Sequence, residues 1–373
     1  MPDTMRQKSL ADYSPALHAN CYSCHPASHL IRAEVPTIEI RAISAAELPR
    51  FLALESDPAR AADQGAYLER LIGVGAMRPE WCWVAVRAGT TVGRFAFWTL
   101  PSVGLPLAIV LLDVAALPES DPHLVGRPAR DARAEVSTML LARAVTEAMT
   151  TDTLELGHVI DEPTQSPQWQ TAPDERAAWL TGAGFELVRT TSRWSFEGPP
   201  PPALTGRLHY RTFEDVGEGA FLDALEQVST GSLDERIRAD RDRLTPAGEA
   251  RAMLDDLRSM AFLPGWWELA YGHDGALVGL VMPARPPSMT TIGYIGVVPE
   301  QRGRGYVDEL LAHGTRTLRR DAPDAVIRTD TDLANEPMAA AFARAGYTRF
   351  GTRREYEYPL NEVTAPAREH DSA

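Results

Sequence analysis

The chain has 373 residues, 44% of them hydrophobic, and a formal net charge of −14 at pH 7. This length favours two domains over one, and the hydrophobic content excludes a globally disordered chain. The acidic balance argues against a nucleic-acid partner and weakly favours a cationic partner such as an amine. No apolar run reaches the roughly 18 residues of a membrane span, so we expect no membrane partner.

Residues 1–36 contain several prolines and show little periodicity, which predicts an irregular arm. The first residues hold no apolar signal segment and the chain has only three cysteines, so we expect a cytoplasmic protein. Cys21, Cys24 and His25 have the spacing of a haem-attachment motif, but haem attachment requires export and a zinc site would lack a fourth ligand. We interpret this motif as chance and expect no metal site.

Residues 37–198 predict, in chain order, a strand, helices, two or three strands, a helix, a strand, a helix and a final strand. Ile38–Arg41 is the first predicted strand, and Ser44 with Glu47 forms a capping box for the helix that follows. Trp83–Val86 and the apolar run after it predict a hairpin. This part of the chain therefore predicts one complete α/β domain.

The same order recurs in residues 203–360, after a proline run at 199–202 that predicts a stiff connector. Leu208–Arg211 corresponds to the first strand, Trp267–Ala270 to the hairpin, and Ile295–Glu300 to Val114–Glu119 of the first copy. The chain is thus predicted to contain two copies of one domain. The polar residues 361–373 predict a disordered tail.

The two copies differ most after the shared Pro-Glu pair. Pro299-Glu300 is followed by Gln-Arg-Gly-Arg-Gly, whereas Pro118-Glu119 is followed by Ser-Asp-Pro-His-Leu-Val-Gly126. Two glycines let a loop turn its N–H groups inward, and the helix that begins directly afterwards adds free N–H groups and a positive dipole end. The second copy therefore predicts a cradle for a pyrophosphate, and the first copy has lost it.

With these motifs the second half, from about 208 to 360, resembles the GNAT superfamily of acyl-CoA-dependent N-acyltransferases, and 37–198 resembles it more weakly. Arg302–Gly305 matches the family pattern Arg/Gln-x-x-Gly-x-Gly/Ala, and Asn335–Met338 followed by Phe342–Tyr347 lies at the usual distance. The chain looks like a tandem GNAT protein, similar to mycothiol synthases. This resemblance implies an α/β protein of two GNAT-like domains, each a mixed, mostly antiparallel sheet flanked by helices.

The resemblance also implies acetyl-CoA, or another acyl-CoA, as co-substrate. The expected CoA-binding residues are Gly296, Val297, Val298, Arg302, Gly303, Arg304, Gly305, Tyr306, Val307 and Asn335. The strand backbone at 296–298 would pair with the pantetheine arm, residues 302–306 would wrap the pyrophosphate, and Asn335 would contact the arm from across the cleft. Val307 stands where the family prefers Gly or Ala, which a first-turn helical residue tolerates. Phe342 stands where a proton-donating tyrosine is usual.

Acyl transfer to an amine needs a base for the ammonium proton and a donor for the oxyanion. A backbone N–H of Val297 or Val298 would supply the donor. Candidates for the acid–base role are Tyr294, Glu268, Asp330 and Asp332, and the sequence does not choose among them.

Other interpretations remain open at this stage. The domain could be a non-catalytic acyl-CoA-binding regulatory module, or both halves could be catalytic. Trp266 and Trp267 are expected in the core, with a role at the acceptor pocket as the alternative. Asp234 and Glu235 are the expected contacts if the small-molecule amine acceptor is cationic. We expect a monomer or a homodimer.

Overall fold

The computed structural model describes residues 37–116, 128–201, 206–260, 262–263, 265–286 and 289–360. All of them belong to one compact unit, which spans Pro36–Ala373. The expected arm and tail, the Cys21-Cys24-His25 motif and the divergent segment 120–126 lie outside the described residues.

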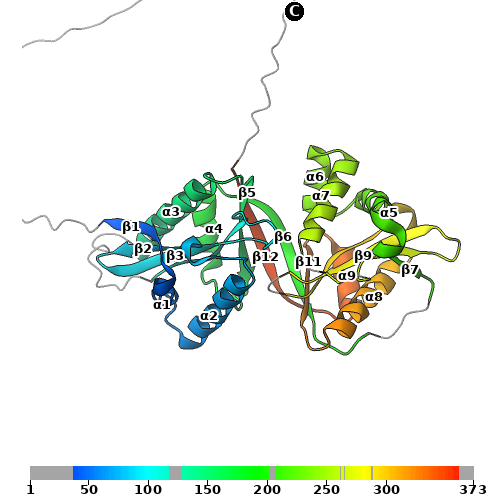
Figure 1. The fold of residues 1–373 in the computed structure, drawn as a ribbon, viewed down its shortest axis with the longest axis horizontal. Coiled ribbons are helices and arrows are strands. Elements are labelled where there is room, and N and C mark those ends of the chain that lie inside the picture. Colours follow the sequence, from blue (N-terminus) through cyan, green and yellow to red (C-terminus); the bar gives the residue numbers. More distant parts are fainter. Residues whose placement is uncertain are drawn as a thin grey trace, which may run out of the picture. The chain divides into compact units, whose positions relative to one another are not determined.

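The first half contains six strands and four α-helices among the described residues (Figure 1). In chain order they are β1 (Ile38–Ala42), α1 (Leu48–Leu52), α2 (Pro58–Gly73), β2 (Cys82–Arg87), β3 (Thr90–Trp98), β4 (Ala108–Val114), α3 (Ala129–Ala148), β5 (Glu155–Glu162), α4 (Pro173–Gly182) and β6 (Glu186–Phe196). Local chemistry sets several ends. Asp57 caps α2 by accepting from the Ala59 N–H at 2.9 Å. Ala88 and Gly89 both have positive φ, which suits the two-residue turn that joins β2 to β3.

The second half repeats this order. Its elements are β7 (His209–Thr212), α5 (Phe213–Ser229), α6 (Glu235–Arg243), α7 (Pro246–Ser259), β8 (Glu268–Tyr271), β9 (Leu277–Ala284), β10 (Thr291–Val297), α8 (Tyr306–Asp321), β11 (Ile327–Asp332), α9 (Glu336–Arg344) and β12 (Thr348–Pro359). The predicted fold class, two similar α/β halves with mostly antiparallel strands, is confirmed.

The two halves exchange their last strands, which the sequence does not indicate. One sheet has the order β1-β2-β3-β4-β5-β12-β6-β11, and the other has the order β10-β9-β8-β7. Strand β12, from the end of the second half, lies antiparallel between β5 and β6 of the first half. Strand β6 in turn pairs with β11 of the second half. The proline connector thus separates the halves along the chain, but the sheet continues from one to the other.

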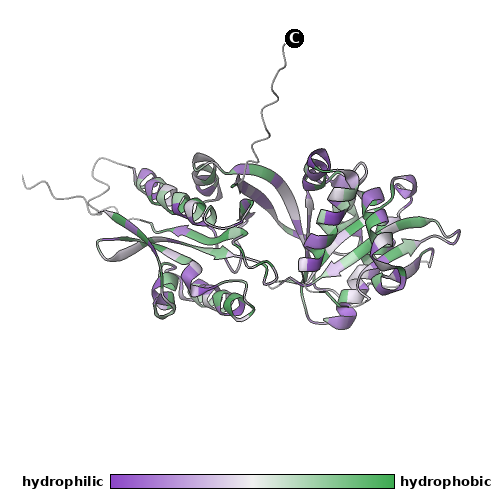
Figure 2. Ribbon diagram, turned by 45° about the horizontal axis from the view of Figure 1, so that its top comes forward, coloured by the Kyte–Doolittle hydropathy of each residue, from purple (hydrophilic) through white to green (hydrophobic). Residues whose placement is uncertain are grey.

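The hydrophobic cores follow the same exchange. Trp194 and Phe196 of β6 are buried with the core of the second half, whereas Tyr356 of β12 is buried with that of the first. Figure 2 shows that hydrophobic positions concentrate along the strands and on the helix faces that cover them. Trp266 and Trp267 are both 1% exposed and lie in this core, as expected. Within the described ranges, no helix has the length and apolar character needed to cross a membrane.

Candidate active site

Strands β10 and β11 diverge after a short contact. The Arg328 N–H donates to the Thr290 carbonyl at 2.9 Å, and the Thr329 hydroxyl lies 3.4 Å from the Ile292 carbonyl. Beyond this point no hydrogen bond joins the two strands in the described part of the chain, and the other edge of β10 is paired with β9 except at a bulge at Gly293. The edge of β10 from Gly293 to Val297 is therefore open to an added extended ligand.

The open strand leads directly into the predicted phosphate loop. Gly303 and Gly305 have φ values of 74° and 76°, so both occupy the left-handed region that favours glycine. Helix α8 begins at Tyr306, immediately after the loop, and Val307 lies in its first turn. The loop and the helix N-terminus together present free backbone N–H groups to an anion.

The Arg302 side chain has a different role from the one expected. Its guanidinium donates to the carbonyl oxygens of Val297, Gly231, Val228 and Thr230 at 3.0, 3.2, 2.9 and 2.8 Å. These carbonyls lie at the end of β10 and at the end of α5 and the turn after it. Arg302 therefore fixes the loop against α5.

Arg207 is a cation beside the loop that sequence reasoning missed. Its guanidinium donates to the Arg304 carbonyl at 3.1 Å, lies 4.6 Å from the Tyr306 ring centre, and forms an ion pair with Glu309. It precedes the first strand of the second half, so no local motif connects it with the loop. Its guanidinium lies beside Gly305, so it holds the loop against the first turns of α8.

The open edge of β10 forms one wall of a cavity of about 1080 Å³. The lining includes the phosphate loop, Tyr294, the α5–α6 turn and β11. It also includes first-half residues such as Tyr67, Trp98 and Gln168. Both halves thus build one cleft.

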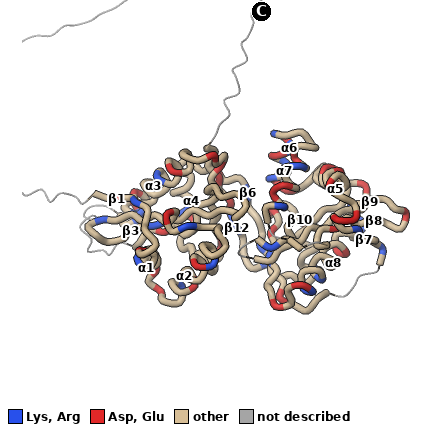
Figure 3. Tube along the Cα trace, in the orientation of Figure 1, with Lys and Arg blue, Asp and Glu red and all other residues tan. Residues whose placement is uncertain are grey.

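Paired charges form much of its floor. Asp161 binds Arg353 at 2.8 Å and Arg193 at 2.8 Å, and Asp330 lies 3.4 Å from Arg193 and 3.8 Å from Arg353. Arginine and acidic positions lie close together beside β10 and β12 (Figure 3). Burial alone would raise the pKa of Asp161, but Arg353 and Arg193 bring it below its usual value.

The structure brings only two of the four acid–base candidates to the cleft. Tyr294 and Asp330 line it. Asp332 is 1% exposed and accepts from Arg189 and from the Glu235 N–H. Glu268 hydrogen-bonds His313 of α8 at 2.6 Å and is not part of the cleft lining. Burial raises the pKa of Tyr294 above its usual range, so its hydroxyl keeps its proton at neutral pH.

Two further expected residues lie at the cleft. Asn335 lines it, and its side-chain oxygen accepts from the Met338 N–H at 3.3 Å, which caps α9. Phe342 also lines it and is 1% exposed, with its ring packed on Trp194 and Tyr347. The hydroxyl of Tyr347 is bound to Thr315 at 2.7 Å, so it does not replace the missing tyrosine.

Sequence reasoning also missed Asp256. It lies on α7 and lines the cleft as an exposed residue, and desolvation by nearby protein atoms raises its pKa. Asp234 and Glu235, in contrast, have partners already. Asp234 binds Arg189 at 2.8 Å and caps α6, and the backbone of Glu235 binds Asp332.

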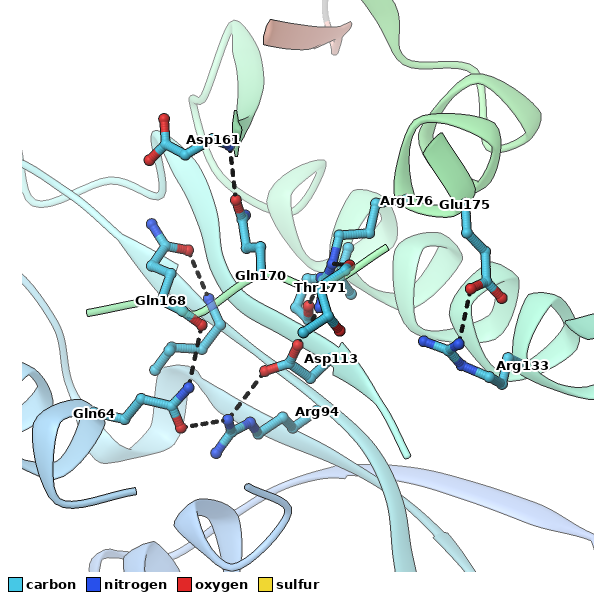
Figure 4. Close-up of polar contacts among 12 residues, drawn as sticks. Gln64, Arg94, Asp113, Arg133, Asp161, Gln168, Gln170, Thr171, Glu175 and Arg176 are labelled. Atoms are coloured by element: carbon cyan, nitrogen blue, oxygen red, sulfur yellow. Dashed lines mark hydrogen bonds and ion pairs between the residues drawn. The ribbon is translucent and has the colours of Figure 1, made fainter. Parts of the chain in front are cut away.

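The first half has a corresponding strand divergence, but the chain itself fills it (Figure 4). Strands β4 and β5 pair only at Ala108–Gly157 and Ile109–His158. Gln168 then accepts from the Leu111 N–H at 3.2 Å. Gln170 accepts from the Asp161 N–H at 3.1 Å and donates to the Val159 carbonyl at 2.6 Å.

Arg176 completes this plug by donating to the Leu112 carbonyl and to Asp113. Arg94 binds the same carboxylate at 3.0 Å. The backbone groups that β10 leaves open in the second half are therefore occupied by side chains in the first half. The first half therefore has no open strand edge at this position, in contrast to the second half.

Comparisons with known proteins agree with this geometry. Residues 235–347 match the model of the Acetyltransferase (GNAT) family. This part of the chain is a GNAT-family domain. A GCN5-related N-acetyltransferase from Sphaerobacter thermophilus has the same fold, with a TM-score of 0.52 and 18% identity over 87% of this chain and 96% of that one.

Two other structures are similar at lower scores. A tandem GNAT protein from the clavulanic acid biosynthesis pathway has a TM-score of 0.48 and 16% identity over 87% of this chain and 99% of its own. A GCN5-related N-acetyltransferase from Kribbella flavida has a TM-score of 0.44 and 13% identity over 83% and 98%. No curated protein matches the sequence. The GNAT fold supports acyl transfer in general. The open edge of β10 and the glycine loop lie within the residues that match the family model. No group of three or more His, Cys, Asp or Glu side chains suited to a metal occurs among the described residues.

Proposed function

We propose that the protein transfers an acetyl or related acyl group from acyl-CoA to a small-molecule amine. The observation that carries this proposal is the open edge of β10, which is joined by the short 3-10 turn Pro299–Gln301 to the Gly303–Gly305 loop and the N-terminus of α8. An acyl-CoA has the matching chemistry, because its pantetheine amides can pair with a strand edge and its pyrophosphate suits a helix N-terminus.

The reaction needs little covalent help from the protein. The neutral amine nitrogen attacks the thioester carbonyl, the C–N bond forms, the C–S bond breaks, and the amine loses one proton while the thiolate gains one. Holding both reactants in the cleft can supply about 7–11 kcal/mol of the barrier. The N–H groups of the β10 edge would stabilise the oxyanion.

The proton donor and the base would be different residues. Tyr294 lies on β10 and lines the cleft, so we assign its hydroxyl as the acid that protonates the departing thiolate. Asp330 and Asp256 are the carboxylates at the cleft that remain as bases, and Asp256 is preferred because it has no arginine in ion-pair contact among the described residues. Its raised pKa makes it a better proton acceptor than an ordinary aspartate.

The second candidate function is an acyl-CoA-binding regulatory module. Phe342 favours it, because the residue stands where a proton-donating tyrosine is usual. The two functions are separated by measuring thiol release from acetyl-CoA with a panel of amines, alongside calorimetric binding of CoA. Amine-dependent thiol release supports the transferase, whereas CoA binding without release for any amine supports the module.

A further inference from the structure

Three arginines of the cleft lining, Arg193, Arg328 and Arg353, form one cluster. Arg193 and Arg353 share Asp161 and Asp330, which accounts for two charges of each sign. Arg328 is a third arginine lining the same cavity. It stacks over the Phe350 ring at 5.4 Å, and Arg193 stacks over the same ring at 4.9 Å.

Arg328 has no carboxylate within ion-pairing distance in the part of the chain that the structure describes. Within the ranges described, Arg328 is thus the one of these three arginines without an ion-paired carboxylate, and it is half-buried. An uncompensated positive charge is costly at such a site, because water cannot solvate it fully. In agreement, burial and the neighbouring Arg353 and Arg328 lower the pKa of Arg193.

This cluster lies far from the phosphate loop. Arg328 is hydrogen-bonded to Thr290 at the start of β10, whereas Gly303 and Gly305 follow the end of that strand. The seven residues of β10 span roughly 20 Å at the usual rise per residue. The pyrophosphate of a CoA held by the loop would therefore not reach the cluster, and the anion that completes it must come from the other substrate.

We propose that the acceptor amine carries a carboxylate or phosphate group, which Arg328 binds together with the buried Arg193 in the cleft. The assignment rests on the transferase function proposed above. Arginine suits this role because its planar fork binds both oxyanions bidentately. The first half contributes to the same wall through Gln165, which accepts from Arg193 at 3.4 Å, and through Arg70, which also lines the cavity.

An anionic acceptor is the opposite of the cationic partner that the acidic composition weakly favours. A cationic acceptor would need free carboxylates, but Asp234 is bound to Arg189, and Asp161 and Asp330 are bound to arginines. Asp256 is the one lining carboxylate without an ion-paired arginine among the described residues, and it is already assigned as the base. Six arginines and four aspartates line the cleft: Arg70, Arg189, Arg193, Arg302, Arg328, Arg353, Asp161, Asp234, Asp256 and Asp330. The lining therefore contains more arginines than carboxylates, inside a chain of net charge −14.

The test compares matched acceptors on the full-length protein. Amino acids are paired with their carboxamides, and phosphoethanolamine is paired with ethanolamine, with thiol release from acetyl-CoA as the readout. We expect the anionic member of at least one pair to have a kcat/KM more than tenfold higher. Arg328→Gln should remove that preference and leave the KM of acetyl-CoA unchanged, and Arg328→Lys should restore part of it.

Arg349→Gln is the matched control, because Arg349 is an exposed arginine on β12 and lies outside the cleft lining. It should keep the wild-type preference. Equal or higher activity with the neutral members would overturn the inference. A change confined to the KM of acetyl-CoA in Arg328→Gln would also overturn it, since Arg328 would then serve the CoA.

A binding measurement separates failure of this inference from failure of the proposed function. Inorganic phosphate is titrated calorimetrically into protein saturated with CoA, so that the phosphate loop is occupied. Binding that is lost in Arg328→Gln and kept in Arg349→Gln supports the anion site even if no amine is acylated. Equal heats in wild type and Arg328→Gln would reject the site whatever the catalytic result.

Discussion

Arg353 and Asp161 face each other in register on β12 and β5, and two hydrogen bonds of 2.8 and 3.0 Å join their side chains. The residues are separated by almost two hundred positions and come from opposite halves of the chain. Their contact is therefore possible only because the halves exchange strands. It also places both side chains at the floor of the cleft, so the exchange couples folding of the first half to the geometry of the site.

This coupling predicts that β12 is required for folding of the first half. A variant that ends at Gly346 removes the strand between β5 and β6, with its buried Tyr356. We expect the truncated protein to lose cooperative unfolding and to show fast hydrogen exchange in β5 and β6. A variant that ends at Leu360 keeps the last backbone contact, with Leu154, and should unfold like the full chain. Protection of β5 in the shorter variant would contradict the exchanged arrangement.

Arg302 predicts an effect on acetyl-CoA binding without a direct contact to phosphate. Arg302→Gln removes most of four hydrogen bonds that fix the loop to α5. The KM of acetyl-CoA should rise by roughly tenfold, since about 1.4 kcal/mol of lost binding energy gives a factor of ten, and Tm should fall. Arg304→Gln changes an exposed arginine in the same loop and should leave Tm unchanged. Equal Tm values for the two variants would show that Arg302 does not hold the loop.

Some features of the fold and the site could be predicted from the sequence, and others could not. The repeated order of strands and helices follows from apolar runs and turns, and the left-handed φ of Gly303 and Gly305 follows from a pattern that only glycine fits easily. The strand exchange could not be predicted, because alternation of apolar and polar residues defines the two faces of a strand but not which strand pairs with it. The contacts of Gln168 and Gln170 with β4 and β5 could not be predicted either, because glutamines in a loop show no periodic pattern.

Tyr294 predicts a split between kcat and KM. If its hydroxyl protonates the departing thiolate, Tyr294→Phe should lower kcat by up to roughly a hundredfold, the low end for acid–base catalysis, because a thiolate already leaves well. The KM of acetyl-CoA should change little. The burial that raises its pKa predicts that the wild-type rate does not fall between pH 7 and 9 through loss of this proton. Steady-state kinetics across that range would check both points, and an unchanged kcat in the variant would exclude Tyr294 as the acid.

His158 predicts how stability depends on pH. It is 1% exposed, its Nδ1 lies 2.8 Å from the Ile109 carbonyl, and burial lowers its pKa to about 4. The unfolded chain binds this proton near pH 6.5 and the folded chain only near pH 4. The contribution of neutral, buried His158 to the free energy of unfolding is therefore fully present above about pH 6.5 and is lost as the pH falls towards 4.

The loss amounts to about 3 kcal/mol, since one pKa unit corresponds to about 1.4 kcal/mol. Denaturant unfolding at pH 7 and at pH 4.5 would measure it. His158→Asn, which keeps a hydrogen-bond donor, should flatten the pH dependence relative to the wild type. The same slope in both proteins would assign the acid sensitivity to other groups.

The central claim is that the chain binds one acyl-CoA, at β10 and the Gly303–Gly305 loop of the second half. Calorimetric titration of the full-length protein with acetyl-CoA tests it most directly. We predict one site per chain, with binding lost in Gly305→Ala and retained in Gly89→Ala, which introduces similar strain at φ 81° in the β2–β3 turn. Two sites per chain, or unchanged binding in Gly305→Ala, would contradict a single acyl-CoA site at this loop.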